Sequence, residues 1–433
     1  MREMKDSGIE WIGKIPVNWK AIPLKWIVKF GKGLPITKDN LIEQGVPVVN
    51  YGQIHSKSNN GTHLQAELIR FVSETYFESN PLSLGKEGDI FFADTSEDYA
   101  GIGNAVLIDT DTPVFAGYHT VIVRPDNQAY SRYLAYLFLT DVWRSQLCSR
   151  ASGIKVFSIT QGLLKKTTVI LPPAEKVVKM TDYLDRKCNQ IDAIITKQQE
   201  VIEKLKEYKL SVITEAVTKG LNPDVPMRDS GIEWIGKIPE HWNILKLQSH
   251  TRMLTPMRDK PENLDGDIPW VRIEDYDGKY ISTSKEGLGV SLETVNEMNL
   301  KIYPVGSILC TSSCDLGKCA IVGREIVSNQ RFINIIPDSN TNSDYLYYLL
   351  LSNAERLNHL STGTIQANLS RKAFEHLMVQ FPPNLEQKEI AGYLDRKCDA
   401  IEFSIRKKQE LINRLDSYKK SLIYEVVTGK KEV

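Results

Sequence analysis

Three cysteines in the second half of the chain are the first residues whose types could hold a metal. Cys310, Cys314 and Cys319 lie within one short segment. A structural zinc site needs four ligands at defined spacings, and no fourth ligand follows at such a spacing. We therefore expect reduced thiols in and around a strand, and we predict no metal site.

Two glycine-containing segments could cradle a bound ligand. Residues 30–33 read Phe-Gly-Lys-Gly, faintly like a methyl-donor loop, and residues 101–103 read Gly-Ile-Gly. The Asn-Pro-Pro-Phe-like tetrapeptide expected of an adenine methyltransferase is absent. The sequence also lacks a Gly-x-x-x-x-Gly-Lys-Ser/Thr loop and the His-Glu-x-x-His and Gly-x-Ser-x-Gly motifs. We expect both segments to be turns and predict no catalytic centre.

The charge balance limits which partners the chain could bind alone. Its 433 residues contain 54 Lys and Arg and 54 Asp and Glu, so the net charge is zero. Proteins that bind DNA by themselves usually carry excess positive charge, because phosphate neutralisation supplies most of the non-specific affinity. The balance argues against a stand-alone DNA binder but allows a base reader whose partner holds the phosphates.

The sequence carries no pattern of a membrane or exported protein. No apolar run approaches the ~20 residues that span a bilayer. The first residues lack the apolar core of a signal peptide. We expect a cytoplasmic protein.

The chain contains two copies of one framework. Residues 6–16, DSGIEWIGKIP, recur unchanged as residues 229–239. Residues 183–188, YLDRKC, recur as residues 393–398, each downstream of a Pro-Pro pair. The sequence between these shared ends diverges strongly. An old duplication with free drift would not explain why the ends stayed identical while the middles changed.

Each copy ends in a long helical pattern. Its apolar residues recur at alternating steps of three and four over about four heptads, a pattern that favours a coiled-coil seam over an ordinary core helix. A lone helix of this kind would expose its apolar stripe, so we expect the two seams to pack on each other. The predicted seam residues are Ile191, Ile195, Ile202, Leu205 and Val212 in the first helix and Ile401, Ile405, Ile412, Leu415 and Leu422 in the second.

The divergent middles predict a mixed α/β fold rich in strands. Short β-branched and aromatic runs lie between Gly, Asp and Pro turn signals. We expect one helix per copy, over residues 130–149 and 344–357. The predicted strands cover residues 46–49, 89–92, 105–108 and 120–123 in the first copy and residues 308–310, 320–322 and 333–336 in the second.

Taken together, these residues resemble type I restriction–modification specificity subunits. The resemblance rests on a Trp-Ile-Gly-x-Ile-Pro start, a variable middle, a Pro-Pro step and a long Leu-Asp-x-Lys helix, all present twice. It covers essentially the whole chain. The second copy carries the family's Pro-Pro-x-x-Glu-Gln step at residues 382–387, whereas the first departs from it at residues 172–177, where Val177 replaces the glutamine.

The resemblance implies a tandem architecture with a pseudo-two-fold axis. Two target-recognition domains, residues 1–173 and 223–383, would each read one half of a split DNA site. Helices at residues 174–222 and 384–433 would form an antiparallel coiled-coil spacer. The implied partners are double-stranded DNA, two methyltransferase subunits and, through the complex, motor–nuclease subunits. Methyl donor, ATP and metal would belong to these partners, so the chain itself would be a non-catalytic subunit with no cofactor.

Two other functions stay open on the sequence alone. One is a self-contained nuclease or methyltransferase with unrecognised catalytic residues. The other is a repeat scaffold with no role in nucleic-acid binding.

Loops that leave the central strands are the natural place for side chains that read DNA bases. For each such residue the alternative is a solvated loop position, and for His119 it is also an interior histidine. The candidate base contacts are Thr95, Ser96, Glu97, Tyr99, His119 and Lys155 in the first domain and Thr311, Ser312, Ser313, Lys318, Arg331 and Gln366 in the second.

Overall fold

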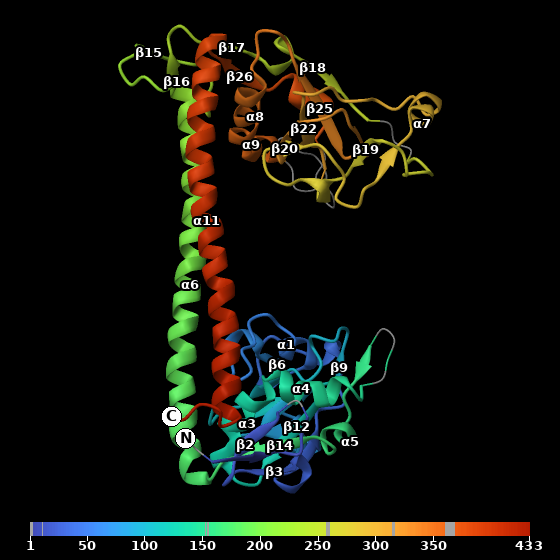
Figure 1. Cartoon of the computed structure of the whole chain (residues 1–433), viewed down its shortest axis with the longest axis vertical. Coiled ribbons are helices and arrows are strands. Elements are labelled where there is room, and N and C mark those ends of the chain that lie inside the picture. Colours follow the sequence, from blue (N-terminus) through green and yellow to red (C-terminus); the bar gives the residue numbers. More distant parts are fainter. Residues whose placement is uncertain are drawn as a thin grey trace. The chain divides into compact units, whose positions relative to one another are not determined.

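The chain folds into two compact units. The computed structural model describes residues 3–10, 12–151, 153, 156–256, 260–313, 317–359 and 369–433. Unit 1 comprises Met1–Lys197 with Glu410–Val433, and unit 2 comprises Gln198–Gln409. Each unit therefore holds one β-rich half of the duplicated sequence and one end of each of two long helices (Figure 1).

Unit 1 is built around two four-stranded sheets. The first has the order β10 (Ala105–Leu107), β8 (Ile90–Ala93), β12 (Thr120–Pro125), β4 (Val28–Lys32); the second has the order β6 (Arg70–Val72), β5 (Val46–Val49), β11 (Val114–Ala116), β7 (Leu84–Gly85). Neighbours in the first sheet are antiparallel, whereas β5 and β11 run parallel in the second. The central strand β8 is fully buried, so this sheet forms the middle of the core.

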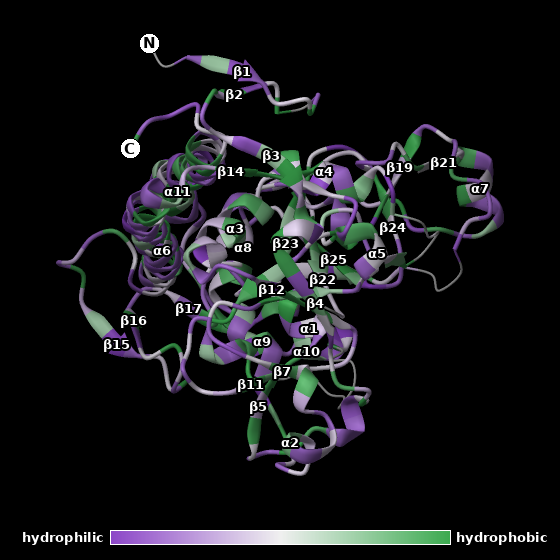
Figure 2. Ribbon diagram, turned by 90° about the horizontal axis from the view of Figure 1, so that it is seen from below, coloured by the Kyte–Doolittle hydropathy of each residue, from purple (hydrophilic) through white to green (hydrophobic). Residues whose placement is uncertain are grey.

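Unit 2 repeats this arrangement with different residues. One sheet has the order β18 (Thr251–Leu254), β25 (Phe332–Pro337), β22 (Ile308–Thr311), β23 (Cys319–Val322), β20 (Tyr280–Ile281); the other has the order β21 (Gly289–Val290), β19 (Ile268–Val271), β24 (Val327–Ser328). Strand β22 lies between β23 and β25 as β8 lies between β10 and β12. Hydropathy colouring shows the green of apolar residues along the labelled strands β12, β22 and β25 (Figure 2), and the residues of β8 are buried apolar side chains. The strand predictions for both copies are confirmed.

Five small antiparallel pairs complete the strands. Two of them, β1 with β2 and β15 with β16, contain residues of the repeated segments 6–16 and 229–239, so the starts of the two copies fold alike. The pairs are β1 (Met4–Asp6) with β2 (Lys14–Pro16), β3 (Lys20–Pro23) with β14 (Thr168–Leu171), β15 (Met227–Asp229) with β16 (Lys237–Pro239), β17 (Asn243–Lys246) with β26 (Met378–Phe381), and β9 (Thr95–Ser96) with β13 (Phe157–Ser158).

The prediction of one helix per copy in the middle segments was wrong, because each is divided in two. The pairs are α3 (Ser131–Phe138) with α4 (Asp141–Cys148) and α8 (Ser343–Ser352) with α9 (Ala354–His359). Thr140 has an extended backbone, and its hydroxyl accepts from the Trp143 amide at 3.4 Å, which begins a new helix. Asn353 donates to the Leu349 carbonyl at 2.8 Å at the other break.

The remaining helices are short. The α-helices are α1 (Tyr51–Ile54), α2 (Tyr76–Ser79), α5 (Gln161–Leu164), α7 (Leu292–Glu297) and α10 (Arg371–Glu375). The 3-10 helices are Leu24–Trp26, Lys38–Asn40, Ala66–Leu68, Pro81–Ser83, Gln128–Tyr130, Leu247–Ser249 and Ile273–Asp275.

Residues 30–33, predicted to be a turn, lie mostly in strand β4. Gly31 pairs with Ile122 of β12, and a Cβ built on Gly31 would lie 3.2 Å from the Ile122 Cβ. The glycine therefore allows close packing inside a strand rather than a reversal of the chain. Residues 101–103 form a turn as predicted.

Two long helices leave the β-rich parts. Helix α6 (Ala174–Lys219) has 46 residues and, at 1.5 Å per residue, is about 69 Å long. Helix α11 (Asn384–Val427) has 44 residues. All ten predicted seam residues are buried or half-buried. The five most buried are Ile191, Ile202, Ile401, Ile412 and Leu422.

Polar contacts between α6 and α11 show how their halves pair inside each unit. In unit 1 the Lys419 ammonium lies 2.6 Å from the Asp192 carboxylate, and in unit 2 Lys209 lies 2.5 Å from Glu402. In unit 2, Gln198 contacts Lys408 while the later residue Lys209 contacts the earlier residue Glu402, so the paired halves run antiparallel there. An offset of 210 relates the two lysines, and the same offset relates the two acids, so the ion pairs are repeat copies of each other.

The shared YLDRKC segment joins each long helix to its β-rich part. In unit 1 the Tyr136 hydroxyl donates to Asp185 at 2.6 Å, and in unit 2 Tyr348 donates to Asp395 at 2.6 Å. Burial raises the pKa of both tyrosines, so they remain protonated donors. Both partners of this bond occur in both copies, so the bond is made twice, although Asp185 also pairs with Arg132 and Asp395 with Lys279.

The C-terminal end of each long helix is seated in a core. In unit 1 the buried Tyr133 hydroxyl donates to the Val427 carbonyl at 2.8 Å. In unit 2 the Gln380 amide donates to the Val217 carbonyl, also at 2.8 Å. The end of α11 therefore occupies in unit 1 the place that the end of α6 occupies in unit 2.

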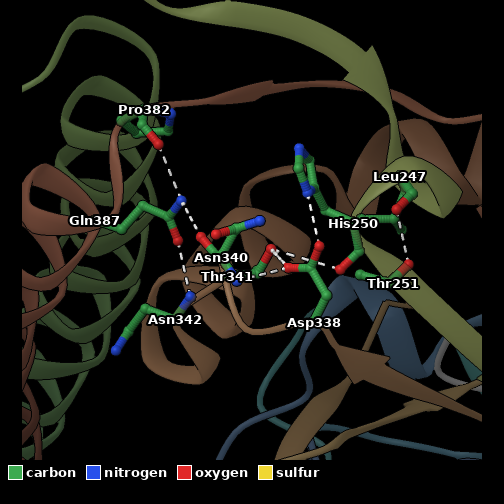
Figure 3. A network of polar contacts seen from close by, with 9 residues as sticks. All are labelled: Leu247, His250, Thr251, Asp338, Asn340, Thr341, Asn342, Pro382 and Gln387. Carbon is green, nitrogen blue, oxygen red and sulfur yellow. Dashed lines mark hydrogen bonds and ion pairs between the residues drawn. The ribbon is translucent and has the colours of Figure 1, made fainter.

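The start of α11 differs from the start of α6 in its polarity. Gln387 is 2% exposed, accepts from the Asn342 amide at 2.8 Å, and donates to the carbonyls of Asn340 and Pro382 (Figure 3). Its counterpart Val177 is completely buried among apolar residues. Both helices nevertheless begin one residue after their Pro-Pro pair, so the missing glutamine does not shift the start of α6.

Candidate nucleic-acid interface

In unit 1, three backbone segments meet where β8 ends and β12 begins. Ala93 pairs with Thr120, and the next amide, of Asp94, donates to the His119 carbonyl at 3.0 Å. The Ala93 amide donates to the Asn104 carbonyl at 3.1 Å. We call residues 94–104 together with 118–119 the β8 edge. Its backbone is fixed by the sheet, so its side chains are presented from a rigid base.

A cavity of about 590 Å³ opens at the β8 edge. Of the predicted contacts in this domain, Thr95, Ser96, Glu97 and His119 line it, and the structure therefore brings these four together. The exposed Tyr99 is not in the lining; its ring packs 4.5 Å from that of Phe157. Lys155 lies outside the described residues. Among the described residues, the lining consists of Tyr51, Gly52, His55, Thr95, Ser96, Glu97, Asp98, Ala100, Gly101, Asn104, His119 and Val156.

A chain of hydrogen bonds behind the cavity fixes His55, which sequence reasoning missed. Arg144 donates to the Asn104 side-chain oxygen at 2.7 Å, and the Asn104 amide donates to Nδ1 of His55 at 3.1 Å. Nε2 of His55 donates to the Thr95 carbonyl at 2.8 Å. Burial lowers the pKa of Arg144. Both ring nitrogens of His55 therefore have hydrogen-bond partners within the protein. We assign His55 a structural role in the wall of the cavity.

The remaining polar groups of the cavity include two carboxylates, those of Glu97 and Asp98, which only accept hydrogen bonds. Nδ1 of His119 lies 3.2 Å from an Asp94 carboxylate oxygen, and the His119 ring packs 5.3 Å from that of Tyr51. The Asp98 carboxylate accepts from the Gly101 amide at 2.6 Å, which closes the turn after β9. Glu97 is exposed at the mouth. Such a set of side chains suits amino groups on base edges better than phosphate.

Unit 2 builds the equivalent edge with the same backbone bonds, and we call residues 311–313 together with 317–318 and 331 the β22 edge. The Ser312 amide donates to the Arg331 carbonyl at 2.8 Å, and the Thr311 amide donates to the Lys318 carbonyl at 2.9 Å. Arg331 therefore occupies the position of His119, and Lys318 that of Asn104.

The predicted contacts of unit 2 differ in exposure. Thr311 is completely buried and Ser313 nearly so, whereas Lys318 and Arg331 are exposed. Ser312 is half-buried, and its carbonyl accepts from the Leu369 amide at 2.8 Å. Gln366 lies outside the described residues. The side chains best placed to meet a ligand at this edge are cationic.

In the described part of the chain, no group of three His, Cys, Asp or Glu could hold a metal ion. Cys310 and Cys319 lie opposite each other on β22 and β23 with sulfurs 2.7 Å apart, and burial raises the pKa of Cys310. Cys314 lies outside the described residues. None of the helices described is long and apolar enough to cross a membrane.

Both halves of the chain match one protein family. The family model of the type I restriction modification DNA specificity domain matches residues 16–204 and again residues 247–413. The chain belongs to this family. The two matches cover both β-rich parts together with most of the long helices, so the family resemblance seen in the sequence is confirmed.

Curated relatives and a solved structure agree with this assignment. The MjaIX specificity subunit of Methanocaldococcus jannaschii is 33% identical over 187 residues, which are 42% of this chain and 43% of that protein. The putative MjaX specificity subunit of the same organism is 25% identical and covers 98% of this chain and 96% of its own. A chain from a structural study of complex assembly in the type I R-M system shares the fold, with a TM-score of 0.69, 14% identity, and coverage of 95% of this chain and 98% of that chain.

Proposed function

We propose that this chain is the DNA-specificity subunit of a type I restriction–modification complex, in which each recognition domain reads one half of a bipartite, asymmetric DNA site. The recognition domains are residues 1–173 and 223–383. The observation that carries the proposal is the double family match on a structure whose β8 and β22 edges share backbone bonds but not side chains. A common frame with different edges suits two half-sites that differ in sequence.

The long helices, residues 174–222 and 384–433, act as the spacer and bind two methyltransferase subunits. With these partners the complex methylates adenine, and with motor–nuclease subunits it restricts unmodified DNA in the cytoplasm. The partners supply methyl donor, ATP and metal, and this chain is not catalytic. Its zero net charge suits a base reader whose partners hold the DNA backbone.

The test is to co-express the chain with the methyltransferase subunit of its own operon and map methylated adenines in host DNA by long-read sequencing. The expected result is one split, asymmetric motif with a gap of fixed length. The purified chain, incubated alone with DNA, methyl donor or divalent metal, is the control for an activity of its own. A stable complex that leaves DNA unmethylated would contradict the proposal, as would cleavage or methylation by the chain alone.

A further inference from the structure

The β8 and β22 edges place different side-chain chemistry at the same structural position. The residue before β12 is His119, and the residue before β25 is Arg331. Each carbonyl accepts from the amide that follows the central strand, at 3.0 Å from Asp94 and at 2.8 Å from Ser312. Beside them, Asn104 in unit 1 corresponds to the cationic Lys318 in unit 2.

Arginine can only donate hydrogen bonds, so it favours bases that present hydrogen-bond acceptors. Its guanidinium presents donors in a fixed fork and has no acceptor. In the major groove, guanine shows two adjacent acceptors, O6 and N7, while adenine pairs one acceptor with one donor. An exposed arginine on a rigid sheet edge therefore matches guanine and leaves adenine or cytosine poorly satisfied.

We infer that the recognition domain of residues 223–383 reads a guanine through Arg331, and that the equivalent position of the other domain, His119, does not. The inference rests on the proposed function and adds the base chemistry of one half-site. Arg331 is exposed, its backbone is held by Ser312, and its amide donates to the Asn329 side chain at 3.1 Å. The side chain can therefore change without disturbing the strand that follows.

The experiment uses the whole complex with its methyltransferase partner and duplexes that carry each of the four bases at every position of the motif. Arg331→Ala should lower discrimination roughly 10-fold to 100-fold at a single guanine of one half-site, and leave the other half-site unchanged. Arg331→Gln should move the preference at that position from guanine towards adenine, because glutamine pairs with the adenine edge. His119→Ala should affect the other half-site only.

Arg324→Ala is the matched control. Arg324 is also an exposed arginine of unit 2, and it donates to the Asp267 carbonyl at 3.0 Å. It follows β23 and so lies at the opposite end of the β22–β23 pair from Arg331. Its loss should leave the motif as it is. Co-purification of each variant with the methyltransferase subunit shows that the fold is retained.

The outcomes separate the inference from the proposed function. Equal loss of methylation at all sequences, with a shallower salt dependence, would mean that Arg331 contacts phosphate and would overturn the inference. So would relaxed specificity at a base other than guanine, or no change. In each of these cases the wild-type complex would still methylate a split motif, whereas failure of the proposed function would remove that motif itself.

Discussion

Asp185 and Asp395 each accept a hydrogen bond from a buried tyrosine at 2.6 Å, whereas the edge positions of the same two units carry His119 and Arg331. The first pair belongs to a tyrosine–aspartate bond that is made in both copies. The second pair shares only its backbone bonds. The bond that fixes the junction is therefore repeated, whereas the exposed residues at the edges differ. Substitutions at the repeated junction and at the divergent positions test whether the two groups of residues have these different roles.

The largest effect is expected in the repeated junction. Leu184 and Leu394 are equivalent under the 210-residue offset, and both are completely buried. Changing either to alanine should cost about 2–5 kcal/mol of unfolding free energy, from lost burial plus the cavity left behind. Denaturant unfolding of the full chain measures both variants. The exposed Ile194 changed to alanine is the control, and very unequal costs would show that the two junctions are not equivalent.

A smaller effect is expected where the two helix starts differ. Gln387→Val places in unit 2 the residue that unit 1 has at Val177. It leaves the Asn342 amide and the carbonyls of Asn340 and Pro382 without their partner, at a cost of roughly 1–3 kcal/mol. Thermal unfolding of the full chain measures this. A neutral result would show that the glutamine network does not stabilise unit 2.

A substitution in the wall of the unit 1 cavity should change base discrimination in one half-site only. Asn104→Ala removes the link between Arg144 and His55, so His55 loses the acceptor contact at Nδ1. We expect about 5-fold weaker discrimination in the half-site read by unit 1, since a hydrogen bond contributes about 1 kcal/mol. Methylation of permuted duplexes measures it. Altered specificity in the other half-site would contradict this placement.

The smallest effect is expected from the ion pairs between the long helices. Lys209 and Lys419 are repeat copies, and their acidic partners Glu402 and Asp192 are more than a third exposed. Because water screens such pairs, Lys209→Met and Lys419→Met should each change stability by only about 0–1 kcal/mol. Double-mutant cycles at low and high salt measure the coupling. A coupling well above this range would mean that the pairs are energetically buried.

The sequence was a good guide to whatever depended on local pattern. Short β-branched and aromatic runs between turn residues predicted the central strands, and the three–four spacing predicted the seam residues from Ile191 to Leu422. Sequence patterns gave wrong predictions where tertiary packing determines the local backbone structure. The Phe-Gly-Lys-Gly pattern predicts a turn, although Gly31 packs against Ile122 within a strand. The break at Thr140 depends on a single capping hydroxyl.

The candidate interface was predicted only in part for the same reason. Polar residues directly after a central strand, such as Thr95 and Glu97, could be found from sequence position. His55 and Asn104 could not, because they lie 49 residues apart and meet only when β10 returns beside β8. Equivalence between His119 and Arg331 likewise requires the strand register, since the sequence around them has diverged.

The most direct test of the account replaces residues 20–172 with the matching segment of another specificity subunit and maps methylated adenines in cells that express the hybrid complex. The account predicts that one half of the motif changes to that of the donor, while the other half and the gap stay as they were. A motif that changes in both halves, or in neither while methylation persists, would contradict the claim that each recognition domain reads its own half-site.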